Sequence, residues 1–151
     1  MSTEVGSPVA GLTAALSDVP DPVFSQAMVG PGLAVKPSGG EADAVAPVAG
    51  QVATLHPHAF VIVASTGGAV LVHLGIDTVK LKGEGFTLHV AKGDSVEAGQ
   101  KIVTWNPTEV EAQGYASICP VVALEAQAES LADLREDTQV LPGDLLFTID
   151  A

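Results

Sequence analysis

Short apolar runs separated by glycine, proline and polar residues form the main pattern of this chain. Several of the runs are rich in β-branched side chains, and turn-forming residues bound most of them. This pattern is typical of strands rather than helices, and it predicts an all-β fold, an antiparallel β-sandwich or barrel-like domain. The expected strands lie at 32–35, 44–48, 60–63, 70–76, 86–90, 101–105, 120–124 and 145–149.

The pattern leaves room for one or two short helices. Asn106 followed by Pro107 provides an N-cap and a proline at the first helical position, which predicts a helix over 106–113. Leu131 and Leu134, three residues apart, predict a second helix over 129–134 on a weaker signal. The polar start of the chain predicts a flexible N-terminal tail at 1–7, followed by a single domain at 8–151.

Two segments of the chain resemble each other. The stretches 93–102 and 138–146 both read Val-x-x-Gly-x-x-aliphatic and both lead into an expected strand. The likeness fits a fold with two related halves, although glycine turns before strands also arise by chance.

Composition narrows the classes of function. A chain of 151 residues can bury one core, and its formal net charge of −12 disfavours nucleic acid, which binds lysine and arginine. The single cysteine, Cys119, allows no disulfide within the chain and reads as a buried small hydrophobe. With no secretory signal and no apolar run near 20 residues, we expect a cytoplasmic protein without direct membrane insertion.

Two histidines fifteen residues apart, His58 and His73, lie in apolar runs with a turn between them. A turn centred on Ser65-Thr66 puts His58 opposite His73 and Phe60 opposite Leu71, with facing Cβ atoms about 4.5–5.5 Å apart. A turn at 67–68 instead separates the two imidazoles by roughly 13 Å. The function depends on this choice, because only neighbouring imidazoles can share a phosphoryl group, a proton or a metal ion.

The residues alone support a second class of function. His56, His58, His73 and Asp77 supply enough nitrogen and oxygen ligands for zinc, so a zinc-dependent hydrolase is an alternative. Against it, no further glutamate or histidine stands as a general base, and we read His89 as incidental. The purely structural interpretation is that His73 is a half-buried strand histidine and that Asp77 caps the turn that follows it.

The run from Val72 to Phe86, which reads VHLGIDTVKLKGEGF, resembles the signature of the glucose-type enzyme IIA of the bacterial phosphoenolpyruvate:sugar phosphotransferase system. The resemblance covers nearly the whole chain, in the expected order. The segments that also agree are 18–24, 29–37, 45–50, 58–60, 119–122 and 143–144.

This resemblance implies a phosphocarrier that acts through a phosphohistidine. His73 would accept the phosphoryl group on Nε2 from the carrier protein HPr and pass it to a cysteine on the IIB domain of a sugar permease. His58 would be the companion imidazole, and Asp77 would pair with a basic group of the partner. The family leaves room for regulatory protein targets and leaves the sugar open.

The resemblance also implies that no cofactor is required, although relatives can hold zinc between the residues that match His58 and His73 at a partner interface. The chain departs from the family just before its first site histidine, where relatives commonly carry a threonine. The segment Leu55-His56-Pro57-His58 stands there instead, so we expect His56 to offer an imidazole in place of that hydroxyl.

Overall fold

The fold consists of short antiparallel strands, as the hydrophobic pattern predicts. The computed structural model describes residues 2–26, 28–124 and 126–150. Each of the eight expected strands overlaps an observed one. The strands are β1 (Ser2–Gly6), β2 (Gly11–Ala15), β3 (Gly32–Pro37), β4 (Ala42–Val45), β5 (Gly50–His56), β6 (Ala59–Ala64), β7 (Ala69–His73), β8 (Thr87–Leu88), β9 (Ser95–Val96), β10 (Lys101–Trp105), β11 (Cys119–Ala123), β12 (Leu131–Ala132), β13 (Gln139–Val140) and β14 (Leu145–Asp150).

Helical structure is brief. The helices are α1 (Pro22–Ser25) and α2 (Pro107–Ala112), with 3-10 turns η1 (Leu16–Asp18), η2 (Thr78–Leu81) and η3 (Ala128–Ser130). In α2 the Asn106 side chain accepts hydrogen bonds from the backbone N–H groups of Thr108 and Glu109, which confirms the predicted start of that helix.

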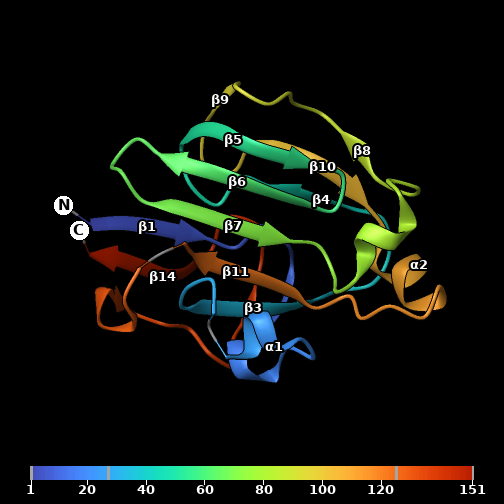
Figure 1. Cartoon of the computed structure of the whole chain (residues 1–151), viewed down its shortest axis with the longest axis horizontal. Coiled ribbons are helices and arrows are strands. Elements are labelled where there is room, and N and C mark those ends of the chain that lie inside the picture. The colour runs from blue at the N-terminus through green and yellow to red at the C-terminus, as the bar shows by residue number, and fades with distance from the viewer. Residues whose placement is uncertain (1, 27, 125, 151) are drawn as a thin grey trace.

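The strands form three sheets (Figure 1). The largest has eight strands in the order β13-β2-β3-β11-β7-β6-β5-β9, and two three-stranded sheets have the orders β4-β10-β8 and β1-β14-β12. The prediction of an all-β antiparallel sandwich is therefore confirmed. Figure 1 also shows the two chain ends side by side, where β1 pairs with β14.

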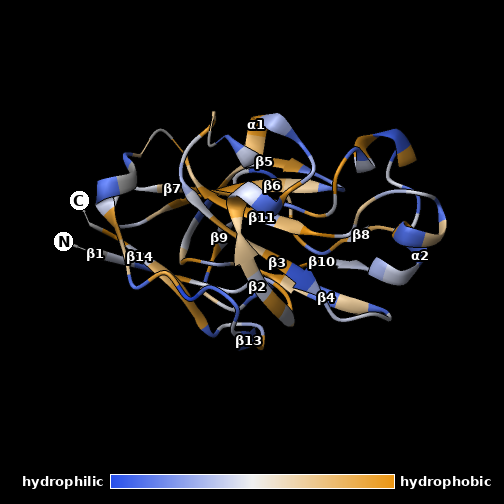
Figure 2. Cartoon of the chain, turned by 90° about the horizontal axis from the view of Figure 1, so that it is seen from below, coloured by the Kyte–Doolittle hydropathy of each residue, from blue (hydrophilic) through white to orange (hydrophobic). Residues whose placement is uncertain are grey.

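Two hydrophobic clusters cover the two faces of the large sheet. The main core draws on all parts of the chain from Val5 to Ile149, and the smaller cluster joins Phe24 of α1 to residues of β3 and β11. The central strands are therefore buried on both faces, and they carry the hydrophobic colour in Figure 2. The smaller cluster positions the site, because it packs α1 against the sheet near the end of β7.

Two local predictions are wrong. Residues 2–6 form strand β1, whose Val5 is fully buried, so pairing with β14 replaces the expected flexible tail at 1–7. The expected helix over 129–134 is only the end of η3 followed by strand β12. There Leu131 pairs with Ile149 and packs on the main core, and that tertiary contact overrides the weak leucine spacing.

The two similar segments occupy equivalent places. In each, the side chain after the glycine accepts a hydrogen bond from the backbone N–H three residues earlier: Gln100 from Glu97, and Asp144 from Leu141. Each valine pairs with the first residue of a strand of the large sheet, Val96 with Gly50 and Val140 with Gly11. The matching backbone bonds run from Gly99 to Ala46 and from Gly143 to Ser7, which supports two related halves.

Within the described residues, no helix is both long enough and apolar enough to cross a membrane.

Candidate functional site

His73 is the last residue of β7, and the turn that follows fixes its ring. Its Nδ1 donates a hydrogen bond to the carbonyl of Gly75, so Nε2 is the nitrogen with a free lone pair. Gly75 has φ +81°, and a Cβ there would lie 2.7 Å from the Ala116 carbonyl oxygen. Only glycine fits this position without a clash. The turn that it allows places the Gly75 carbonyl at Nδ1 of His73, and that hydrogen bond selects the tautomer of His73.

The hairpin between β6 and β7 has neither of the registers considered from the sequence. Ala59, not His58, pairs with His73, and Phe60 pairs with Val72 rather than with Leu71. The loop has three residues, 65–67, closed by the backbone bond from Ala64 to Gly68, and its Gly67 adopts φ +112°. An odd loop shifts the register by one residue and turns Phe60 and Leu71 to opposite faces of the sheet.

The two imidazoles meet all the same, because His58 lies in a turn rather than in a strand. Residues 57 and 58 form the two-residue connection between β5 and β6, in which His56 pairs with Ala59. His56, Ala59 and His73 thus form one cross-strand row over three strands. Ala59 lies between the two histidines in that row and contributes only a methyl group to it.

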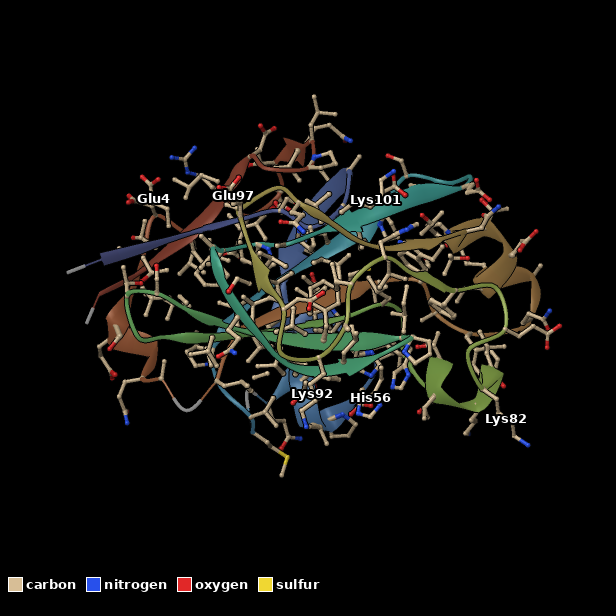
Figure 3. All side chains as sticks on the ribbon, turned by 90° about the horizontal axis from the view of Figure 1, so that it is seen from above. Glu4, His56, Lys82, Lys92, Glu97 and Lys101 are labelled. Carbon is tan, nitrogen blue, oxygen red and sulfur yellow. The ribbon has the colours of Figure 1, made fainter. Side chains whose placement is uncertain are left out.

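Three imidazoles consequently follow one another. The ring of His58 meets that of His73 edge-on, with centroids 5.2 Å apart and an interplanar angle of 69°. It also stacks with the ring of His56, with centroids 5.7 Å apart and an angle of 24°. Figure 3 shows His56 near the end of β5, on the opposite side of the molecule from Lys101.

The surroundings keep both site imidazoles neutral near pH 7. Burial, together with the neighbouring His73 and His56, lowers the pKa of His58 to about 4. Burial also lowers the pKa of His73, but the Gly75 carbonyl and the charges of Asp21 and Asp77 act in the opposite direction. A neutral imidazole is a competent nucleophile, and the nearby carboxylates stabilise positive charge on the ring of His73.

Asp77 is exposed at the start of η2 in a left-handed conformation with φ 61°, and its side chain makes no capping hydrogen bond. The expectation that the Asp77 side chain caps this turn is therefore wrong. Its carboxylate remains available to a partner while still acting on His73.

Phe24 and Ala59 complete the site, and sequence reasoning did not select them. The Phe24 ring lies 5.4 Å from that of His73 at an angle of 58°, so α1 forms one wall beside the acceptor. Phe24 itself is buried, whereas its neighbour Val23 is exposed.

The remaining candidates lie elsewhere or stay inert. His89 is bonded through Nε2 to Thr104 at 2.6 Å, away from the histidine row. Cys119 is fully buried, and burial raises the pKa of its thiol to about 12, as expected for a structural cysteine.

The donor set for a metal is small. In the part of the chain that the structure describes, no three His, Cys, Asp or Glu side chains are grouped to hold an ion. His58 and His73 could supply two nitrogen ligands, but His56, His58, His73 and Asp77 do not form a zinc cage. The hydrolase alternative therefore has no support.

Comparisons with known proteins agree on one family. Residues 3–129 match the family described as phosphoenolpyruvate-dependent sugar phosphotransferase system, EIIA 1. The solved glucose permease IIA from Mycoplasma capricolum superposes with a TM-score of 0.90 at 32% identity, covering 98% of this chain and 96% of that one.

Two curated relatives resemble the chain in sequence. The glucose-specific EIIA component of Oceanobacillus iheyensis is 42% identical over 120 residues, covering 78% of this chain and 72% of the relative. The beta-glucoside-specific EIIBCA component of Bacillus subtilis is 37% identical over 147 residues, covering 96% of this chain. The chain spans only 24% of that longer relative.

The chain belongs to the EIIA family of the phosphoenolpyruvate-dependent sugar phosphotransferase system. As a member of that family it is a phosphotransferase component, which carries a phosphoryl group as a phosphohistidine.

Proposed function

We propose that His73 is the residue on which this phosphotransferase component carries the phosphoryl group. The observation that supports it most is the bond from Nδ1 of His73 to the Gly75 carbonyl, because it leaves Nε2 as the one nucleophilic nitrogen of the ring. The lowered pKa of His73 keeps that nitrogen unprotonated at neutral pH. The same ring is edge-on to a second neutral imidazole, that of His58.

The donor in this proposal is the phosphohistidine of HPr. Nε2 of His73 attacks phosphorus, the P–N bond to HPr breaks, and its electron pair returns to the imidazole of HPr. The phosphoryl group brings a charge of about −1.5 to −2 next to the ring of His58. The N–H of His58 donates to a phosphoryl oxygen, and such charge-assisted bonds are about twice as strong as neutral ones.

The acceptor in this proposal is a cysteine thiolate on the IIB domain of a sugar permease. The P–S bond forms as the P–Nε2 bond breaks, and His73 regains its lone pair. The EIIBCA relative carries a B component in its own name, which supports such a partner. Phosphoryl transfer depends mainly on positioning and electrostatics, so no metal is required; a zinc ion held by His58 and His73 would need further ligands from a partner.

The partner surface in this proposal combines apolar and acidic groups around the two histidines. The exposed side chains Val23 and Val79 lie on α1 and η2, the two segments that flank His73. Asp77 faces outward beside them and pairs with a basic group of HPr. A regulatory protein would bind the same surface around the two histidines. The buried, unpaired Cys119 supports a cytoplasmic location.

Phosphosite mapping tests the proposal. The chain is incubated with phosphoenolpyruvate, enzyme I and HPr, and phosphohistidine is located by mass spectrometry under non-acidic conditions. We expect His73→Gln to lose the label, and His58→Gln to keep it but to donate poorly to a IIB domain. His89→Gln, a histidine remote from the row, is the matched control and should behave as wild type. A label on any other residue, or no label, contradicts the proposal.

A further inference from the structure

Of the three histidines whose rings contact one another, His56, His58 and His73, only His56 has no role in the proposed function. It is exposed at the end of β5, and it is separated from His73 by Ala59 in the cross-strand row. Two strand spacings amount to roughly 9.5 Å, so His56 does not reach the acceptor nitrogen directly. Its described neighbour in the row of rings is His58.

His58 has little else to fix its ring. Among the described residues, no hydrogen bond reaches either of its ring nitrogens, whereas the ring of His73 is tied to Gly75. The backbone at His58 is firmly held, because its carbonyl accepts a 2.7 Å bond from the N–H of Leu74. The preceding Pro57 fixes one dihedral of the turn, yet the side-chain angles of His58 remain free to rotate.

Contacts with two other rings limit that rotation. The ring of His58 meets that of His73 edge-on and stacks with that of His56. We propose that His56 is a positioning residue, which by stacking on His58 keeps that imidazole aimed at the phosphoryl group on His73. This inference rests on the proposed function of His73 and His58.

The role predicted here depends on the ring of His56 rather than on its charge. Aromatic pairs contribute enough to change a population, and hence a rate, by about three- to tenfold. Removing the ring frees His58 to adopt other rotamers and exposes it to water. Replacing it by another aromatic ring preserves both the contact and the shielding of His58 from water.

Two variants separate these effects: His56→Ala removes the ring, and His56→Phe keeps it. Wild type and both variants of this chain are first phosphorylated on His73 with HPr, and then donate to the IIB domain of the Bacillus subtilis beta-glucoside-specific EIIBCA component. We expect all three proteins to be labelled on His73 at similar rates. Donation should fall about three- to tenfold in His56→Ala and stay within about twofold of wild type in His56→Phe.

Titration of His58 by NMR gives a second readout that needs no acceptor. In wild type its pKa lies near 4 because of burial, so it should stay low in His56→Phe and rise toward its ordinary value in His56→Ala. Unchanged donation and an unchanged pKa in His56→Ala overturn the proposal. So does a Phe variant that fails like Ala, because the imidazole itself is then required. Loss of the label from wild-type His73 would instead refute the proposed function.

Discussion

The two imidazoles of the site are held by different means. His73 ends a strand, and its Nδ1 is locked by the carbonyl of Gly75, a residue that no side chain can replace without a clash. His58 lies in a two-residue turn, where its ring contacts those of His56 and His73 and, among the described residues, accepts and donates no hydrogen bond. Hydrogen bonding therefore fixes one ring, and packing fixes the other.

The difference suits two different tasks. An acceptor needs one nitrogen presented in one direction, and a hydrogen bond to the other nitrogen provides that. In the proposed function the assisting group donates to the phosphoryl group, so packing against neighbouring rings holds it in place while its nitrogens stay free of protein partners among the described residues. Burial lowers the pKa of both rings, but nearby acidic side chains oppose that shift at His73, whereas neighbouring histidines add to it at His58.

Gly75→Ala should break the comparison most severely. The new Cβ would lie 2.7 Å from the Ala116 carbonyl oxygen, so the turn must shift and the bond to Nδ1 of His73 is lost. We expect the rate of phosphorylation by HPr to fall about 100-fold, since misplacement of about 1 Å can have that effect. Rapid-quench measurement of the label on His73 provides the rate.

Gly99→Ala is the matched control for that change. Gly99 has nearly the same backbone angle, φ +86° against +81°, but no atom lies within 4 Å of the added Cβ. Both variants should lose roughly 1–3 kcal/mol of unfolding free energy from backbone strain. Equal phosphorylation rates in the two variants would show that the Gly75 carbonyl does not orient His73.

Asp77→Lys tests the acidic side of the comparison. The exposed carboxylate acts on His73 and, in the proposed function, pairs with a basic group of HPr, so reversing its charge should lower the second-order rate of phosphorylation by HPr roughly tenfold. The loss should shrink at high salt. Glu97→Lys makes the same change of charge at an exposed site that Figure 3 shows on the other side from His56. A similar loss in both variants would reduce the effect to net charge.

The sequence predicts the parts of this molecule that depend on local chemistry. Asn106 and Pro107 locate α2, because a cap and a fixed dihedral act within one turn. The register of the β6–β7 hairpin is not predictable in the same way, since Ser65, Thr66 and the two glycines allow several loop lengths. One residue of loop decides which faces Phe60 and Leu71 occupy.

Contacts between distant segments account for the rest. Val5 lies in a polar stretch and becomes core only because β14, at the other end of the chain, pairs with β1. Phe24 comes to the site through a cluster with β3 and β11. Ala59 is important because it pairs with His56 on one side and His73 on the other, and its local sequence does not predict those pairs.

Ala59→Val should affect His58 and spare His73. Extra bulk in the middle of the cross-strand row occupies the space that the ring of His58 needs, while the Gly75 bond to His73 stays intact. We expect His73 to be labelled normally by HPr and donation to a IIB domain to fall about three- to tenfold, the scale of lost aromatic packing. Ala69→Val, on the same strand as His73 but paired with Val63, is the control. Equal donation by both variants would contradict the assigned role of Ala59.

The smallest effect expected is on stability as a function of pH. The pKa of His58 is about 4 in the folded chain against 6.5 ordinarily, so between these values the unfolded chain binds more protons. The contribution of neutral His58 to the free energy of unfolding is fully present above pH 6.5 and is lost as the pH falls from 6.5 toward 4. Urea unfolding at pH 4.5 and 7.5 should show a smaller difference for His58→Gln than for wild type. The carboxylates contribute equally to both proteins, so they cancel in this comparison, and an identical difference would mean that folding does not hold His58 neutral.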